Sequence, residues 1–340
     1  MRLKILAARR RLQARRRRSS GVSSPILRRL SLVAPINFNL TRGDGGHIRA
    51  FLDALDDAVL KRRLEVRLDF RKTVRFMVPG ALLLYAELHR VIALSSLGKP
   101  VKVSAPKNDR ARQVMKQIGI FNLTGDVIAV NVSRADVIYW RLANGQTQSG
   151  NEMQILEAVA DRVNKSDTTR IEKSGLWRGV TEAVNNAHEH AYKNTRADGF
   201  AGLPNVKWWL LTQIRDQRFT AAVCDLGCGY EKTLDASTRE WFASIPRRIA
   251  GLRNADTEAI QAALAYGRTG TNLPERGKGS RDALALLERH GHGELYVLSN
   301  RGVVRYVCQR GRLELKSVSP LDFDVKGTII WWNLDLGVIR

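Results

Sequence analysis

One segment of this 340-residue chain places three polar side chains of different chemistry at helical spacing. Within Trp177 to Tyr192, the positions of Glu182, Asn186 and His190 are i, i+4 and i+8, which an α-helix puts on one face. An amide oxygen suits Mg²⁺ that already carries phosphate oxygens and water, and a carboxylate can polarise a water toward a γ-phosphate. The stripe therefore indicates nucleotide chemistry, and a solvated polar face is the alternative.

A second candidate lies where an apolar run ends in an acid. The run R-F-T-A-A-V-C-D-L from Arg218 to Leu226 predicts a strand ending at Asp225, and Gly227 and Gly229 follow it. The carboxylate can accept a hydrogen bond from the exocyclic amine of adenine, and the glycines permit close backbone approach. Taken alone, D-x-G-x-G also fits many ordinary turns.

A third stretch, Tyr266 to Leu284, is rich in glycine and leads into an apolar helix at Ala283 to Leu287. It predicts a mobile loop that closes onto a helix N-terminus, where free N–H groups attract phosphate. It is not a Walker A loop, because position 272 is Asn and Lys278 is followed by Gly279. The glycines are Gly267, Gly270, Gly277 and Gly279, and the basic residues that add counter-charge are Arg268, Arg276 and Lys278.

The last pieces are strands. Glu294 to Ser299 and Val303 to Val307 predict a hairpin that turns at residues 300–302. The sequence K-G-T-I-I-W-W from Lys326 to Trp332 places a Gly-Thr pair before a hydrophobic strand.

These pieces, in this order, resemble the GHKL ATPase family (gyrase, heat-shock chaperone, histidine kinase, MutL). The resemblance covers residues 151–340. E-A-V-N-N-A-H-E-H at 182–190 resembles the family's N-box, D-L-G-C-G at 225–229 the first glycine box, R-G-K-G-S-R-D-A-L at 276–284 the second, and G-T-I-I at 327–330 the last. The fold it implies is the Bergerat α/β sandwich with a mixed sheet.

The resemblance also implies cofactors and residue roles. ATP and Mg²⁺ are the expected cofactors, with Asn186 on the metal, Glu182 as general base, and Asp225 and Thr328 at the adenine. His190, Gly227 and Gly229 complete the expected pocket. The loop from Gly267 to Gly279 is the expected ATP lid and includes Arg268, Thr269, Gly277, Lys278 and Gly279. Ser280 and Arg281 depart from the residues that many members have there, and no segment resembles a phosphoacceptor helix, so histidine autophosphorylation is disfavoured.

The first half of the chain predicts a small α/β domain over residues 35–142, because helical and strand patterns alternate. The expected helices cover 47–60, 79–97 and 109–118, and the expected strands cover 64–70, 101–104 and 136–142. The order of elements, with L-D-F at 68–70, V-P-G-A-L-L-L at 78–84 and Q-I-G-I at 117–120, resembles a STAS-like domain. No hydroxyl occurs at 78–81, where regulatory members carry a phosphorylatable Ser or Thr, so docking or dimerisation is expected rather than a phospho-switch. Residues 143–150 are the expected linker.

Charge is uneven along the chain. The net charge is +23, and residues 1–30 hold eleven Arg or Lys and no acid. We expect residues 1–34 to be a disordered basic arm that contacts nucleic acid or another polyanion, with a solubilising tail as the alternative.

No apolar stretch approaches the roughly 20 residues that cross a bilayer, and three cysteines are too few for a disulfide framework, so a cytoplasmic protein is expected.

Three functions fit these patterns. The first is an ATPase that acts as a conformational switch and engages a protein or nucleic-acid partner, with a homodimer expected from the family. The second is an anti-sigma-type Ser/Thr protein kinase, since a partner hydroxyl can replace water in phosphoryl transfer. The third is a nucleic-acid-binding protein whose affinity for nucleic acid is regulated by ATP.

Overall fold

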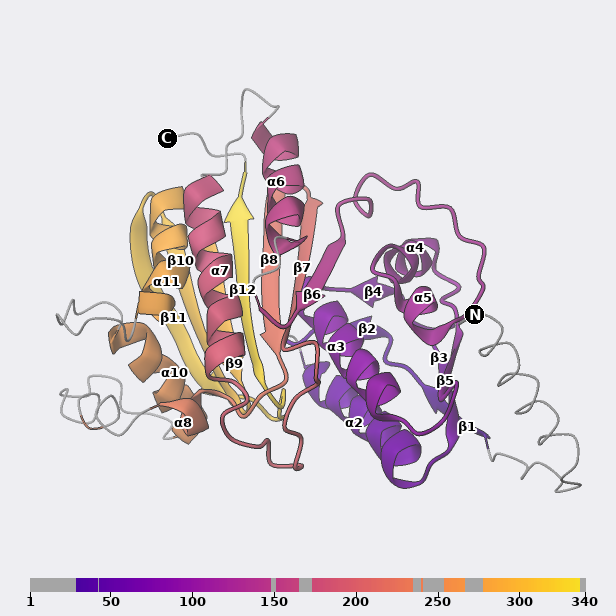
Figure 1. Ribbon diagram of the computed structural model, residues 1–340. Coiled ribbons are helices and arrows are strands. Elements are labelled where there is room, and N and C mark those ends of the chain that lie inside the picture. Colours follow the sequence, from indigo (N-terminus) through magenta and orange to yellow (C-terminus); the bar gives the residue numbers. More distant parts are fainter. Residues whose placement is uncertain are drawn as a thin grey trace, which may run out of the picture.

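The computed structural model describes residues 29–41, 43–147, 151–164, 173–234, 240, 254–266 and 278–336. They form two α/β units packed against each other (Figure 1). The N-terminal unit contains β1 (Arg29–Val33), β2 (Asn37–Phe38), α2 (Gly45–Asp56), the π-helical turn η1 (Asp57–Lys61), β3 (Glu65–Asp69), β4 (Arg75–Phe76), α3 (Val78–Leu94), β5 (Val101–Ser104), α4 (Asp109–Gln117) and α5 (Ile120–Thr124).

The C-terminal unit is built on a larger sheet. Its elements are β6 (Arg141–Gly145), α6 (Asn151–Asn164), α7 (Lys173–Glu189), β7 (Trp208–Arg215), β8 (Arg218–Asp225), α8 (Tyr230–Thr233), α10 (Ala255–Tyr266), α11 (Lys278–His290), β9 (Gly293–Ser299), β10 (Gly302–Gln309), β11 (Arg312–Pro320) and β12 (Thr328–Asp335).

The large sheet has seven strands in the order β11-β10-β9-β12-β8-β7-β6, and every pairing between them is antiparallel. Tight hairpins join β7 to β8, β9 to β10 and β10 to β11. Between β7 and β8, Asp216 and Gln217 both have positive φ, the geometry of a turn that joins antiparallel neighbours. Among the described strands, parallel pairing is confined to the small sheets β1-β3-β5 and β2-β4. The protein thus contains both kinds of sheet, but the mixed sheet expected in the C-terminal half is corrected to an antiparallel one.

Both faces of the large sheet are covered. Helices α6, α7, α10 and α11 lie on one face, and α3 of the N-terminal unit packs on β7 and β8 on the other (Figure 1). Successive side chains alternate between the two cores, so that Trp208 and Trp332 join the helical side while Trp209 and Trp331 join the side of α3. Strands buried on both faces have continuous apolar runs, which explains W-W-L-L in β7 and I-I-W-W in β12.

Most predicted elements appear close to their expected places, but the ends of the N-terminal unit differ. β1 lies inside the expected basic arm, where Arg29–Val33 pairs in parallel with β3. The strand expected at 136–142 is shifted, because residues 135–139 form turns and the strand β6 runs from Arg141 to Gly145. β6 overlaps the expected linker and joins the large sheet through β7, so it belongs to the C-terminal unit. These short segments carry little pattern of their own, and their pairing partners decide their conformation.

Among the described residues, no helix combines the length and the apolar character that crossing a bilayer would require.

The interface between the units yields a stability prediction. Trp209 is fully buried, and its indole N–H donates to Nδ1 of His89 in α3 at 3.2 Å. Replacing Trp209→Ala removes a large side chain from the shared core, so we expect the free energy of unfolding to fall by about 3–5 kcal/mol. Urea denaturation, monitored by circular dichroism, should give a single transition for the wild type and a single transition for Trp209→Ala. Two transitions, with only the later or earlier one shifted, would contradict a shared core.

Candidate functional site

Helix α7 carries the predicted polar stripe. Val180, Val184 and Ala187 are buried in the core between α7 and the sheet, while Glu182, Asn186 and His190 are half-buried. The helix ends at Glu189, and the backbone N–H of His190 donates to the carbonyl of Asn186 at 3.0 Å in the turn that follows. The imidazole Nδ1 lies 3.1 Å from Nζ of Lys193. Glu182 and Asn186 therefore share one face of α7, while His190 lies one residue beyond the helix.

The environment of Glu182 makes it a stronger base than an exposed glutamate. Partial burial raises the pKa of its carboxyl, and the negative charges of Asp282 in α11 and Glu189 raise the pKa further. A carboxylate whose pKa moves toward neutrality accepts a proton more readily near pH 7.

Asp225 and Thr328 meet through the sheet. Asp225 is the last residue of β8 and Thr328 the first of β12, and the two are direct partners in the antiparallel register. The Asp225 carboxylate accepts hydrogen bonds from the backbone N–H of Gly227 at 2.8 Å and from the backbone N–H and hydroxyl of Thr328. The two residues expected at the adenine are thus brought together by strand pairing.

The carboxyl of Asp225 has an unusual proton affinity. Burial raises its pKa from 3.8 to about 7, although the hydrogen bonds from Gly227 and Thr328 and the charge of Arg196 act in the opposite direction. A buried carboxylate that is ionised only near neutral pH gains from a ligand that donates a hydrogen bond to it.

Two glycines are required by close approaches around Asp225. A Cβ at Gly227 would lie 2.2 Å from the carbonyl oxygen of Ala191, and one at Gly327 would lie 2.2 Å from the carbonyl oxygen of Asp225. Gly327 also has φ +149°, which other residues rarely adopt. The segment after α7 and the segment before β12 are therefore packed directly against the end of β8.

This packing connects α7 to the end of β8. The N–H of Ala191 donates to the carbonyl of Asn186 at 3.3 Å, and the carbonyl of Ala191 accepts from the N–H of Cys228 at 2.8 Å. The stripe on α7 and the D-L-G-C-G segment are consequently neighbours, although residues 191–224 separate them in the sequence.

Further residues that the sequence patterns did not single out belong to this site. The hydroxyl of Ser299, at the end of β9, accepts from the N–H of Tyr230 at 2.9 Å and lies 3.4 Å from the hydroxyl of Thr328. The side-chain amide of Asn300 donates to the carbonyl of Cys228 at 3.0 Å. Burial raises the pKa of Tyr230, and the charges of Asp225 and Glu182 add to this effect. Ser299 and Asn300 come from the predicted hairpin, but only strand order places that hairpin beside β12.

The expected lid falls largely outside the described residues. Arg268, Thr269 and Gly277 lie in the stretch 267–277, of which nothing is described. Lys278 and Gly279 are the first two residues of α11, and α11 packs along α7. The last two residues of the expected lid thus form the start of α11.

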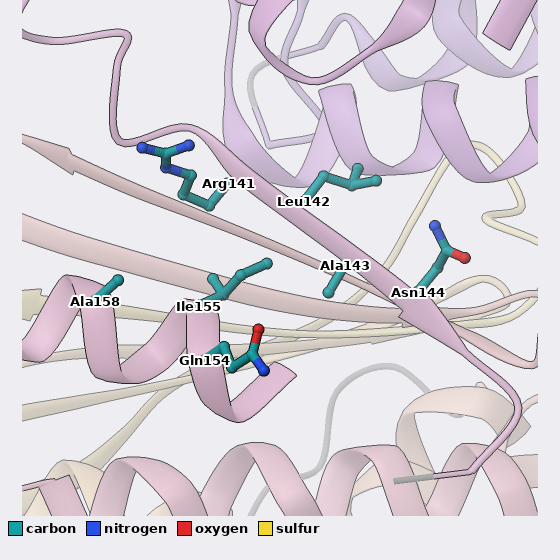
Figure 2. Close-up of a pocket in the computed structure, with 7 residues that line it drawn as sticks. All are labelled: Arg141, Leu142, Ala143, Asn144, Gln154, Ile155 and Ala158. Atoms are coloured by element: carbon teal, nitrogen blue, oxygen red, sulfur yellow. The ribbon is translucent and has the colours of Figure 1, made fainter. Parts of the chain in front are cut away.

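A pocket of about 500 Å³ lies elsewhere, between the edge strand β6 and helix α6 (Figure 2). It contains none of the predicted site residues; its lining is Arg141, Leu142, Ala143, Asn144, Gln154, Ile155 and Ala158. Across the described part of the chain, no three His, Cys, Asp or Glu residues gather as a metal site. The assignment of Asn186 to a metal ion stays a prediction.

Comparison with family models, curated proteins and solved structures finds no match to this chain.

The raised pKa of Asp225 predicts a pH dependence of stability. Between about pH 4 and pH 7 the folded protein keeps a proton on this carboxyl that the unfolded chain releases, so stability falls as pH rises through that window. The side chain in Asp225→Asn cannot titrate. From pH 5 to pH 8 the free energy of unfolding of the wild type should therefore fall by about 2–3 kcal/mol relative to that of the variant. Urea midpoints of both proteins at several pH values measure this. A difference that stays constant with pH would contradict the raised pKa.

Proposed function

We propose that this protein binds Mg²⁺-ATP where Asp225, Thr328 and the end of α7 meet, and acts as an ATP-dependent conformational switch of the GHKL type. The observation that carries the proposal is the direct pairing of Asp225 with Thr328 beside the helix that bears Glu182 and Asn186. A lone D-x-G-x-G fits many turns, but here the same segment meets the polar stripe of α7 and the Gly-Thr pair of β12 at one end of the sheet. That convergence supports a nucleotide site.

Adenine recognition follows from the hydrogen-bonding groups. The Asp225 carboxylate accepts a hydrogen bond from the exocyclic amine, and this bond favours the ionised form that burial disfavours. The hydroxyl of Thr328 stands next to it as a second polar group. Guanine presents a carbonyl oxygen where adenine presents the amine, so two acceptors would face each other at Asp225. The site therefore favours ATP over GTP.

Phosphate chemistry is assigned to the other side of the site. The Asn186 amide oxygen binds Mg²⁺, which neutralises charge on the triphosphate when bound. The N-terminus of α11, with Lys278 as its first residue, offers backbone N–H groups and a helix dipole to the phosphates. Glu182, with its raised pKa, takes the proton of the attacking water.

The architecture supports the same family. Helices on one face of a sheet that ends in the Asp225 and Thr328 pair agree with a Bergerat sandwich, although the sheet here is antiparallel. The parallel strands β1-β3-β5 with their helices agree with a STAS-like unit, whose role is docking. The partners are a second copy of the chain, a protein, or a polyanion bound by the basic residues before β1.

Nucleotide binding is tested with two neighbouring amides on α7. Asn186→Ala should weaken Mg²⁺-ATP binding at least tenfold, about 1.4 kcal/mol, whereas Asn185→Ala should change it little because the helix turns that side chain about 100° away. Isothermal titration with and without EDTA measures this, since the effect of Asn186→Ala should vanish without Mg²⁺. Equal effects of the two substitutions would exclude the assigned metal ligand, and no ATP uptake by the wild type would exclude the proposed function.

Hydrolysis is tested with two glutamates of the same helix. Glu182→Gln should lower phosphate release by about 100-fold or more, whereas Glu189→Gln, whose side chain is exposed, should leave it within about twofold. Because the pKa of Glu182 is raised, the wild-type rate should rise with pH through a midpoint above that of an ordinary glutamate. With γ-labelled ATP, label on inorganic phosphate supports the ATPase, and label on a protein supports the kinase alternative. Unchanged hydrolysis in Glu182→Gln would contradict the assigned base.

A further inference from the structure

A buried ion cluster joins the two units. Glu87 of α3 is 1% exposed and accepts hydrogen bonds from Arg49 at 2.9 Å, Arg90 at 2.6 Å and Arg196 at 3.3 Å. Arg49 and Arg90 belong to the N-terminal unit, and Arg196 belongs to the C-terminal segment between α7 and β7. Burial raises the pKa of Glu87, but the charges of Arg196, Arg90 and Arg49 outweigh burial and hold the pKa at about 2. Glu87 is therefore ionised at any working pH.

The charges of this cluster balance. Four basic side chains, Arg49, Arg90, Arg196 and Lys326, face four acidic ones, Asp53, Asp56, Glu87 and Asp198. Glu87 and its three arginine partners are nearly fully buried, so removing one of these four leaves an unpaired charge in a buried place, which is costly. The cluster consequently fixes how the two units sit on each other.

The cluster also reaches the candidate nucleotide site. Arg196 donates from Nη1 to the carbonyl of Lys326 at 2.9 Å, and Nζ of Lys326 donates to Asp53 of α2 at 2.7 Å. Lys326 has φ +53°, an uncommon conformation for a residue with a side chain, and Gly327 and Thr328 follow it directly. Two contacts that lead back to the N-terminal unit therefore hold the segment that places Thr328 against Asp225.

We propose that Arg196 is a positioning residue for the nucleotide site: anchored by Glu87 of the N-terminal unit, it holds Lys326 to Thr328 in place against Asp225. This inference rests on the proposed function. Through this anchoring, the N-terminal unit holds the adenine pocket in shape, so the C-terminal unit alone does not carry the complete site. Because coupling between two sites is reciprocal, a partner that shifts α3 changes nucleotide affinity, and nucleotide changes the affinity for that partner by the same factor.

The cluster supplies a matched control for this idea. Arg90 and Arg196 have side chains only 4% and 3% exposed, both bond Glu87, and both lie over the ring of Phe200, at 5.2 and 5.0 Å. Arg90 otherwise pairs with Asp56 of its own unit, whereas Arg196 bonds Lys326. Arg90→Gln and Arg196→Gln thus disturb the same cluster, and only the second removes the contact with the nucleotide site.

The experiment measures ATP and GTP binding by the full-length chain, with melting temperatures recorded alongside. Both variants should melt at a lower temperature than the wild type. Binding is measured at a temperature where both variants are folded, and there only Arg196→Gln should bind ATP at least tenfold more weakly and lose part of its preference for ATP over GTP. Arg90→Gln should stay within threefold of the wild type. A purely structural role would weaken both nucleotides equally and leave the preference intact.

The outcomes separate the two proposals. If the wild type binds no ATP, the proposed function fails and this inference fails with it. If the wild type binds ATP while Arg196→Gln binds equally well, or while both variants lose the same affinity, this inference alone is overturned. Should Arg196→Gln not fold, Arg196→Lys replaces it. Lysine keeps the charge but lacks the guanidinium group, which bonds Glu87, Asp198 and the Lys326 carbonyl at the same time. We again expect a loss of the preference for ATP over GTP, and an unchanged preference overturns the inference.

Discussion

The antiparallel pairing of β8 with β12 is the constraint on which the candidate site depends. It sets Asp225 opposite Thr328 and, through the missing side chain of Gly327, lets the β12 entry lie against the Asp225 carbonyl. The carboxylate is then enclosed by backbone and hydroxyl groups, and its burial raises the pKa more than these donors lower it. A shift of this register by one residue would turn Thr328 to the other face of the sheet and leave the buried acid without the donors of Thr328.

A sheet covered on both faces explains why the site and the N-terminal unit form one structure. The helical layer with α7 and α11 covers one face, and α3 covers the other, so the strands that present Asp225 and Thr328 are held from both sides. Aromatic residues do much of this packing, as Trp209 contacts His89 and Trp331 stacks on Tyr296 at 4.4 Å between ring centroids.

The buried ions around Glu87 add specificity to that packing. Apolar contacts tolerate small displacements, whereas a carboxylate bonded by three guanidinium groups requires each of them in one place. Net stabilisation from such buried charges is small, because desolvation offsets much of the attraction. Their consequence is geometric: they define how α2, α3 and the segments around Arg196 and Lys326 meet.

The sequence by itself determined the local features of this protein. Periodicity predicted the strand 101–104, the helices around α2, α3, α4 and α7, and the hairpin of β9 and β10, because each depends on neighbours within a few residues. That Glu182 and Asn186 share a face likewise follows from helix geometry alone, whereas His190 lies in the turn beyond α7. Tertiary structure decided the rest. Four features depend on contacts between residues far apart in the chain, which no local pattern encodes. β1 pairs within the expected arm, β6 joins the large sheet, and that sheet is antiparallel. Ser299, Asn300 and Arg196 lie around Asp225.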